Sequence, residues 1–260
     1  TAARQYFAAN QAAMLADTQV LWPERWSYDE LMVERQKDPW SFNSELQNEP
    51  VNERDCVFPV EEFTYCSDVY RSVDELLLAL QPHLDFYAGC DPALGKDLLR
   101  GDYSALIVLA RDRRDGSLYI LFADIARRSS TQLIQDLLAF EQRFQFTKIA
   151  VETNQFQEIL AQELERIGRE QGLYPRIERL INDTDKVRRI QGLHSLMKNG
   201  TIKFNRAHHL LLEQARFFPR GKHDDGLDAL EMAVRVASQH YAGPFLHVIR
   251  IHPDGIDEDD

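Results

Sequence analysis

Residues 104–125 read SALIVLARDRRDGSLYILFADI, and the predicted sheet is built outward from them. It contains two runs of apolar, β-branched and aromatic residues, 104–110 and 118–125, joined through Arg113-Arg114-Asp115-Gly116. An Asp-Gly pair between two such runs is typical of a β-hairpin, because glycine tolerates the backbone angles of a tight turn. The stretch therefore predicts two antiparallel strands.

The residues on either side extend this hairpin into a mixed sheet. Upstream, the short apolar run 86–91, closed by Pro92, adds a third antiparallel strand. Downstream, the apolar runs 148–152 and 176–180 alternate with helical patterns, which indicates parallel additions. The predicted fold is therefore α/β, with a mixed five-stranded sheet flanked by helices. Those helices cover 131–144, 155–171, 184–199 with Thr184 as N-cap, 207–217 and 224–240, and a further short strand covers 201–204.

The composition is that of a globular protein in a reducing, intracellular setting. A hydrophobic content of 44% is enough for a buried core, and 260 residues fit one large or two small domains. No apolar run approaches the roughly 18 residues that a membrane span needs. Cys56, Cys66 and Cys90 lack a C-x-x-C spacing, so neither a disulfide framework nor a cysteine zinc site is predicted.

Charge is unevenly distributed along the chain. With 42 acidic and 30 basic side chains, the formal net charge of −12 argues against a protein that coats nucleic acid through bulk charge. Residues 176–222, however, hold 11 basic and 4 acidic side chains, a formal charge of +7. Such a stretch is either a solvated helix face or a local contact for a phosphate backbone.

A phosphate-binding loop is excluded at the glycine-rich segment after the first predicted strand. Five residues separate Gly89 from Gly95 where the motif requires four, and Asp97 stands where a magnesium-binding Ser or Thr belongs. We therefore expect no bound nucleotide. The histidines also lack the H-E-x-x-H spacing of a zinc site.

Carboxylates at strand ends and at a helix start form the candidate site. Asp91 and Glu152 each end a predicted strand, and Asp224, Asp225 and Asp228 crowd the first turn of the last helix. Two simpler roles stay open for these acids, because first-turn acids complement the helix dipole and strand-end acids can simply face water. If the two strands are neighbours, the acids repel one another, and Mg2+ or Mn2+ relieves that repulsion. Two such ions, about 3.5–4 Å apart, can activate water and stabilise the leaving oxygen in phosphodiester cleavage.

Four segments, taken in order, resemble the nuclease domain of the large terminase subunit of tailed bacteriophages, which has an RNase H-like fold. They are GCDPA at 89–93, DYSA at 102–105, VETNQ at 151–155 and HDDGLDAL at 223–230. The segment 40–50 resembles the junction after the ATPase domain of that family. The resemblance implies that residues 1–60 are a linker following an absent ATPase domain, 61–240 the nuclease domain and 241–260 an acidic tail.

The resemblance also implies a Mg2+- or Mn2+-dependent endonuclease that cuts concatemeric phage DNA when packaging starts and ends. Such an enzyme works in the cytoplasm of the host bacterium at the procapsid, with double-stranded DNA, the terminase small subunit and the portal protein as partners. The implied residues are Asp91, Glu152 and Asp225 as catalytic metal ligands, Asp228 as a further ligand, and Asp224 and His223 beside them.

The basic stretch then predicts a DNA-binding face. It comprises Lys186, Arg188, Arg189, Lys203 and Arg206, with Lys186 as the preferred contact. One alternative is a junction resolvase or transposase with the same arrangement of acids. The other is a non-catalytic module that docks a motor onto a portal or small subunit.

Overall fold

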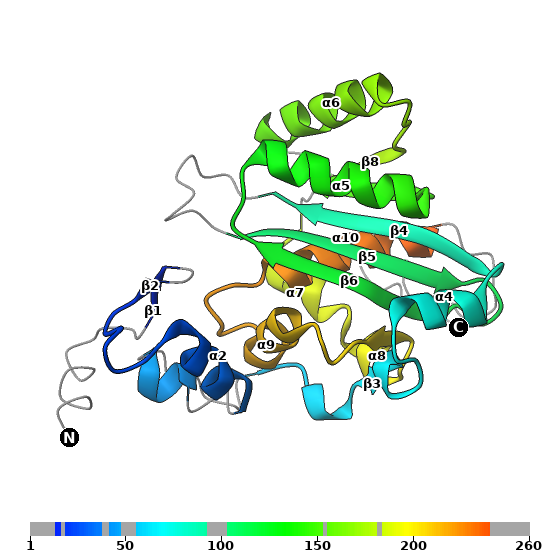
Figure 1. Ribbon diagram of the computed structural model, residues 1–260. Helices are drawn as coiled ribbons and strands as arrows, with labels where there is room; N and C mark the ends of the chain where they lie inside the picture. The colour runs from blue at the N-terminus through cyan, green and yellow to red at the C-terminus, as the bar shows by residue number, and fades with distance from the viewer. Residues whose placement is uncertain are drawn as a thin grey trace, which may run out of the picture.

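The computed structural model describes residues 14–16, 19–37, 42–47, 56–92, 103–152, 155–180 and 184–239. Its centre is a mixed sheet of seven strands in the order β3-β9-β6-β5-β4-β7-β8, with helices on both faces (Figure 1). The predicted class, an α/β sheet flanked by helices, is confirmed.

Three long antiparallel strands form the middle of the sheet. β4 (Leu84–Asp91) pairs with β5 (Ser104–Asp112), which pairs with β6 (Leu118–Ala126). The turn between β5 and β6 contains Gly116, whose φ of 78° favours glycine. Every residue of β5 is buried, which explains why this strand is a continuous apolar run and not an alternating one.

Parallel strands extend the sheet at both edges. β7 (Lys148–Glu152) pairs with β4, and β8 (Ile177–Leu180) pairs with β7, as predicted. On the other side, β9 (Ile202–Phe204) pairs with β6, and β3 (Thr64–Tyr65) pairs with β9. The sheet thus has seven strands where five were predicted. The short strand expected over 201–204 joins the sheet as β9, and the two residues of β3 are too few to show a strand period.

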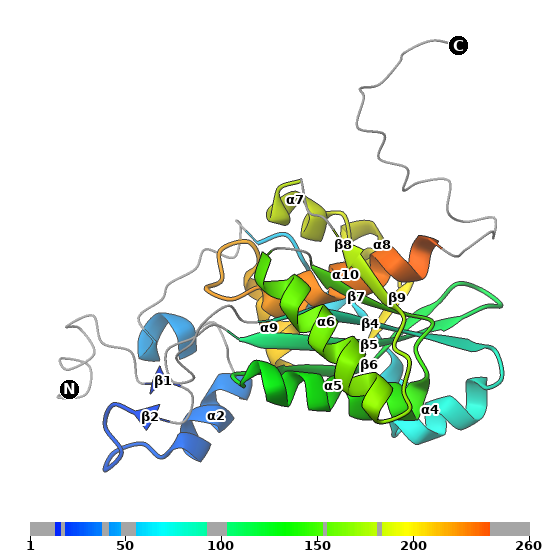
Figure 2. The same cartoon turned by 90° about the horizontal axis from the view of Figure 1, so that it is seen from above.

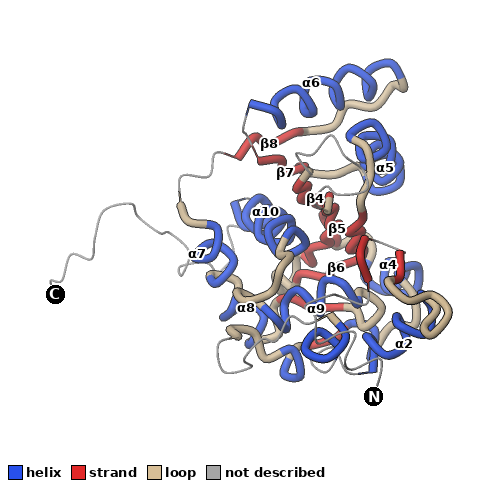
Figure 3. The backbone as a smooth tube through the Cα atoms, turned by 90° about the vertical axis from the view of Figure 1, so that its left-hand side faces the viewer, coloured by secondary structure: helices blue, strands red, loops and turns tan. Residues whose placement is uncertain are grey.

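The helices form one layer on each face of the sheet. α4 (Val73–Leu80), α5 (Ser130–Phe144) and α6 (Gln155–Glu170) cover one face, and α10 (Asp225–Gln239) crosses the other (Figure 3). α7 (Lys186–Gln191) lies beside α10 (Figure 2), and α8 (His194–Lys198) and α9 (His209–Phe217) complete this layer.

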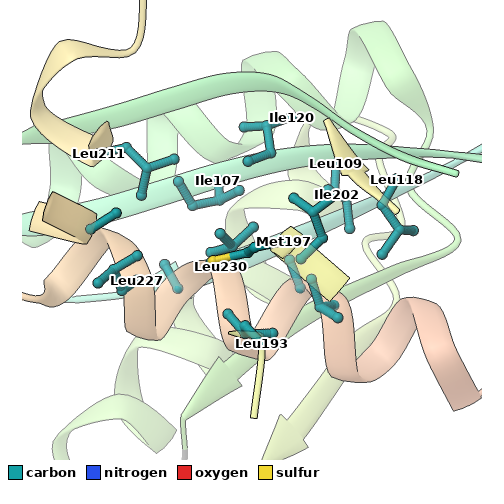
Figure 4. Packing of buried hydrophobic residues seen from close by; sticks show 14 of the residues in the cluster. Ile107, Leu109, Leu118, Ile120, Leu193, Met197, Ile202, Leu211, Leu227 and Leu230 are labelled. Carbon is teal, nitrogen blue, oxygen red and sulfur yellow. The ribbon is translucent and has the colours of Figure 1, made fainter. Parts of the chain in front are cut away.

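Alternate side chains of the sheet supply the two hydrophobic cores. Ile107 and Leu109 of β5 pack in the cluster that contains Leu227 and Leu230 of α10 (Figure 4). Leu106 and Val108 belong instead to the cluster formed with α4, α5 and α6. Because side chains alternate along a strand, the one apolar run of β5 holds both layers together.

The helix predicted over 184–199 is two short helices, α7 and α8, separated at Gly192 and Leu193. The N-cap is Asp185 and not Thr184, because the Asp185 side chain accepts a hydrogen bond of 3.1 Å from the backbone N–H of Arg188. Aspartate caps a helix at least as well as threonine, and glycine is unfavourable inside one, which accounts for both corrections.

The N-terminal part of the described chain rests on α9. α2 (Tyr28–Lys37) begins after Ser27, whose hydroxyl accepts a hydrogen bond from the backbone N–H of Glu30. Arg35 of α2 donates two hydrogen bonds of 2.5 and 2.6 Å to Glu213 of α9. The remaining short elements are β1 (Met14–Ala16), β2 (Gln19–Val20), the π-helix η1 (Phe42–Leu46) and the 3-10 helices η3 (Val60–Glu62) and η4 (Cys66–Asp68).

The division at residue 60 stays a prediction, and Phe58 and Val60 already contribute to the core beneath α10. The acidic tail expected over 241–260 and most of the junction-like segment 40–50 outside 42–47 lie beyond the described residues. Within the described ranges, every helix is too short or too polar to cross a membrane.

Candidate metal centre

The register of two parallel strands brings Asp91 and Glu152 together. β4 pairs with β7 so that Cys90 lies opposite Val151, and the next residue on each strand is an acid. Since the strands run in the same direction, both acids stand at the same edge of the sheet. The expectation that these two strands are neighbours is therefore confirmed.

α10 adds a third carboxylate because its backbone lies directly against β4. A Cβ atom on Gly89 would lie 1.9 Å from the carbonyl oxygen of Ala229 and 2.9 Å from the backbone nitrogen of Ala233. Only a residue without a side chain allows this approach. It brings Asp228, in the first turn of α10, to the ends of β4 and β7.

The resulting carboxylate cluster consists of Asp91, Glu152 and Asp228. Each residue offers one oxygen, and these oxygens lie within 4.8 Å of one another. The side chains of Asp91 and Asp228 are only 13% and 2% exposed. Carboxylate oxygens that converge in this way are the ligands that Mg2+ and Mn2+ prefer.

Asp225, which we expected to be the principal late ligand, lies beside this cluster. Its Oδ2 atom is 3.8 Å from Nδ1 of His223. The charge of Asp225 still acts on Asp91, where it helps to raise the pKa. The structure therefore places Asp228 among the three converging oxygens, and metal binding by Asp225 stays a prediction.

The chain itself supplies a cation to the carboxylate cluster. The Nζ atom of Lys186 lies 2.9 Å from Oδ1 of Asp224, 3.3 Å from Oδ2 of Asp228 and 3.8 Å from Oδ2 of Asp91. Burial lowers the pKa of this amine, but the surrounding carboxylates more than offset that effect and raise it overall. Lys186 is thus a protonated counter-ion of the acids, and Asp224 is its nearest partner.

Two acids of the cluster have raised pKa values, and a bound cation would stabilise their charged forms. Burial raises the pKa of Asp91 to about 8, an effect that Lys186 opposes and the neighbouring acids strengthen. Burial also raises the pKa of Asp228. A divalent ion favours the charged form of both groups, so the donor set fits a metal of this kind.

The residues of the predicted DNA-binding face do not lie together in the structure. Arg188 is exposed on α7, two residues after Lys186. The Arg189 side chain is only 8% exposed, and its Nη1 atom lies 3.0 Å from Asp228 and 2.8 Å from Glu231. Because both contacts occupy a buried guanidinium, Arg189 does not present its charge to a DNA surface.

Lys203 and Arg206 lie towards the other end of the sheet. Lys203 pairs in register with Tyr119 near the start of β6, whereas Asp91 is level with the end of that strand. Arg206 follows β9 and binds both carboxylate oxygens of Asp68, at 2.7 and 2.9 Å. Neither residue is level with the carboxylates, because β9 pairs with the start of β6, whereas Asp91 is level with the end of that strand.

Glu231 and Tyr103 contact residues of the predicted site, Arg189 and His223, although the sequence assigns neither of them a role; Tyr103 belongs to the DYSA segment of the resemblance. Glu231 is a nearly buried acid three residues after Asp228, and a charge among the apolar residues of the last helix is the signal that could have found it. Tyr103 packs edge-to-face on His223 with ring centroids 4.9 Å apart, and the guanidinium of Arg127 lies 4.9 Å from the Tyr103 ring. These contacts join residues that are distant in sequence, so the DYSA segment alone does not predict them.

Several solved structures resemble this fold, among them three of terminases. The human cytomegalovirus terminase nuclease domain, soaked with Mn and inhibitor-bound, is 17% identical, covers 68% of this chain and 92% of its own, and has a TM-score of 0.46. The HK97 bacteriophage large terminase is 14% identical with a TM-score of 0.48, and the match covers 80% of this chain but 50% of that one. The P22 large terminase nuclease domain is 16% identical and has a TM-score of 0.43, and the match covers 59% of this chain and 82% of that one.

No curated protein matches the sequence. The sequence profile of the terminase RNaseH-like domain, by contrast, matches residues 88–235, a span that runs from β4 to α10 and includes Asp91, Glu152 and Asp228. This span is more than half of the chain, and it confirms the expected RNase H-like fold. The chain belongs to the terminase RNaseH-like domain family.

Proposed function

We propose that this protein is a divalent-metal-dependent endonuclease that cleaves double-stranded DNA. The observation that supports this function best is the convergence of Asp91, Glu152 and Asp228, whose oxygens lie within 4.8 Å of one another. These residues would hold Mg2+ or Mn2+, and Asp225 would contribute to the site for a second ion, with Asp224 beside them as the partner of Lys186. When bound, the metal supplies a Lewis acid that activates water and stabilises the leaving oxygen of a phosphodiester.

The side chains of the site would position the metal and the DNA phosphate in this reaction. Asp91 and Glu152 are fixed by paired strands, and Asp228 is fixed by a helix packed on them, so the carboxylates need little rearrangement. Lys186 is 36% exposed, which leaves its ammonium group able to contact a phosphate at the edge of the site. Arg188 extends the positive surface along α7.

Membership in the terminase family supports a place in genome packaging. We propose that the cut substrate is concatemeric phage DNA, that the reaction takes place at the procapsid in the host cytoplasm, and that the terminase small subunit and the portal are partners. Residues 1–60 would link the domain over 61–240 to an ATPase motor, with 241–260 as an acidic tail.

A cleavage assay tests the proposal. Linear duplex DNA and a four-way junction are incubated with the protein in Mg2+, Mn2+ or chelator, and Asp91→Asn, Glu152→Gln and Asp228→Asn are compared with the surface control Asp74→Asn. We expect metal-dependent cutting of linear duplex by the wild type and the control alone. Preferential cutting of the junction would indicate a resolvase, and a folded wild type that never cuts would indicate a docking module.

A further inference from the structure

A chain of alternating charges runs from the carboxylate cluster into the interface between α7 and α10. Nη1 of Arg189 lies 3.0 Å from Oδ1 of Asp228 and 2.8 Å from Oε2 of Glu231. Glu231 in turn accepts hydrogen bonds of 2.9 and 2.6 Å from Arg235, one turn further along α10. The side chains of Asp228, Arg189 and Glu231 are 2%, 8% and 11% exposed. Little water can reach these charged groups, so they depend on their contacts with one another.

The two oxygens of Asp228 have different partners. Oδ1 faces Arg189, whereas Oδ2 faces Lys186, whose Nζ is also 3.8 Å from Asp91. The contact with Arg189 is an ion pair without hydrogen-bond geometry, and its attraction favours the orientation of the carboxylate in which Oδ1 faces the guanidinium and Oδ2 faces Lys186. Arg189 therefore limits the orientations open to Asp228.

The same contact sets the position of α7. Arg189 lies three residues after Lys186, so both side chains project from one side of that short helix. Because Glu231 anchors Arg189 to α10, the face of α7 that carries Lys186 is held against the cluster. One buried guanidinium thus fixes both an acid and its counter-ion.

We propose that Arg189 is a positioning residue for the metal site, which holds Asp228 in its ligating orientation and docks Lys186 beside the carboxylates. This inference rests on the proposed metal binding by Asp91, Glu152 and Asp228. It replaces the role in DNA binding that the basic stretch suggested for Arg189, and it assigns Glu231 the role of anchoring Arg189.

The direction of the change in metal affinity separates positioning from simple electrostatics. Removing a positive charge beside three carboxylates makes the site more negative, which by itself strengthens the attraction for a cation. A positioning residue has the opposite effect, because its loss lets Asp228 turn away. Loss of a residue that orients a metal ligand typically weakens metal binding by about tenfold or more.

Calorimetric titration with Mn2+ and fluorescence anisotropy with a DNA duplex in chelator test the proposal on Arg189→Gln. We expect Mn2+ affinity to fall about tenfold or more, and metal-free DNA affinity to fall less than it does in Arg188→Gln. Arg188→Gln, which removes the same charge from the adjacent exposed side chain, is the matched comparison. It should weaken DNA binding and keep Mn2+ affinity within about twofold.

Contrary results would overturn the role. Unchanged or tighter Mn2+ binding by a folded Arg189→Gln would show that Arg189 acts only through its charge. A loss confined to DNA affinity would show that Arg189 is a DNA-binding residue. If Arg189→Gln does not fold, Arg189→Lys carries the test: it keeps the charge but not the guanidinium geometry, and undiminished Mn2+ affinity would refute the positioning role. A wild type that binds no Mn2+ would instead refute the proposed function itself, together with this inference.

Discussion

Oδ2 of Asp228 lies 3.3 Å from Nζ of Lys186, so the most buried acid of the cluster already has a cation beside it. The charge on Lys186 neutralises part of the repulsion among Asp91, Glu152 and Asp228. The metal-free protein can therefore fold with these acids together, and the site keeps enough negative charge to attract a divalent ion.

Asp228→Asn should weaken metal binding more than Asp225→Asn. The carboxylate of Asp228 converges with Asp91 and Glu152, whereas Asp225 lies beside His223. We expect Asp91→Asn, Glu152→Gln and Asp228→Asn to abolish cleavage, with Asp224→Asn the mildest of the late-helix changes. Mn2+ calorimetry and cleavage rates check this order, which would be contradicted by an Asp225→Asn variant that loses Mn2+ while Asp228→Asn retains it.

In chelator, the contribution of Asp91 to the stability of the protein should decline as the pH rises from about 4 to about 8. The folded-state pKa of Asp91 is about 8, above the usual 3.8, so the folded state holds this proton more tightly than the unfolded state does. The stabilisation from Asp91 is complete below the lower value and is lost as the pH passes through the upper one. Urea unfolding at several pH values should show this slope in the wild type and a shallower one in Asp91→Asn.

Lys186→Met should make the thermal stability of the protein depend more strongly on bound metal. The substitution leaves Asp224, Asp228 and Asp91 without their shared ammonium group, so the metal-free protein is expected to melt at a lower temperature. Mn2+ should then raise the melting temperature of the variant by more than it raises that of the wild type. An equal rise in both proteins would argue that Lys186 does not compensate the cluster.

Gly89→Ala should separate α10 from β4. The added methyl would lie 1.9 Å from the backbone oxygen of Ala229, and backbone cannot move aside as a flexible side chain can. We expect a loss of at least about 3 kcal/mol in the free energy of unfolding, measured in urea. Gly172→Ala is the control: its Cβ would meet nothing within 4 Å, so only the strain of its φ of 74° remains, about 1 kcal/mol.

DNA affinity should depend on α7 and not on the far end of the sheet. We expect Arg188→Gln to reduce affinity for duplex DNA and to lower the slope of log affinity against log salt by about 1. Arg206→Gln removes a charge that is paired with Asp68 away from the carboxylates, and it should change neither quantity. Equal losses from both variants would extend the DNA path along the whole sheet.

The sequence alone determined the features that depend on short-range chemistry. The Asp-Gly turn and the strand at the apolar run of β5 could be predicted because each depends on residues next to one another. Asp91 and Glu152 could be singled out in the same way, since a charge at the end of an apolar strand must find a partner or water. That their two strands are neighbours was only a condition of the sequence argument, and the pairing of β4 with β7 meets it.

Only the tertiary structure decided which late acid joins them and what the basic residues do. The rotation of α10 about its own axis depends on its close contact with Gly89 and on the core beneath it, and that rotation places Asp228 in the cluster. Arg189 has the sequence pattern of a surface charge, yet it is buried against Glu231, 42 residues away. Helix rotation and burial are set by long-range packing, which no local pattern encodes, and for this reason the ligand set and the role of Arg189 required the folded chain.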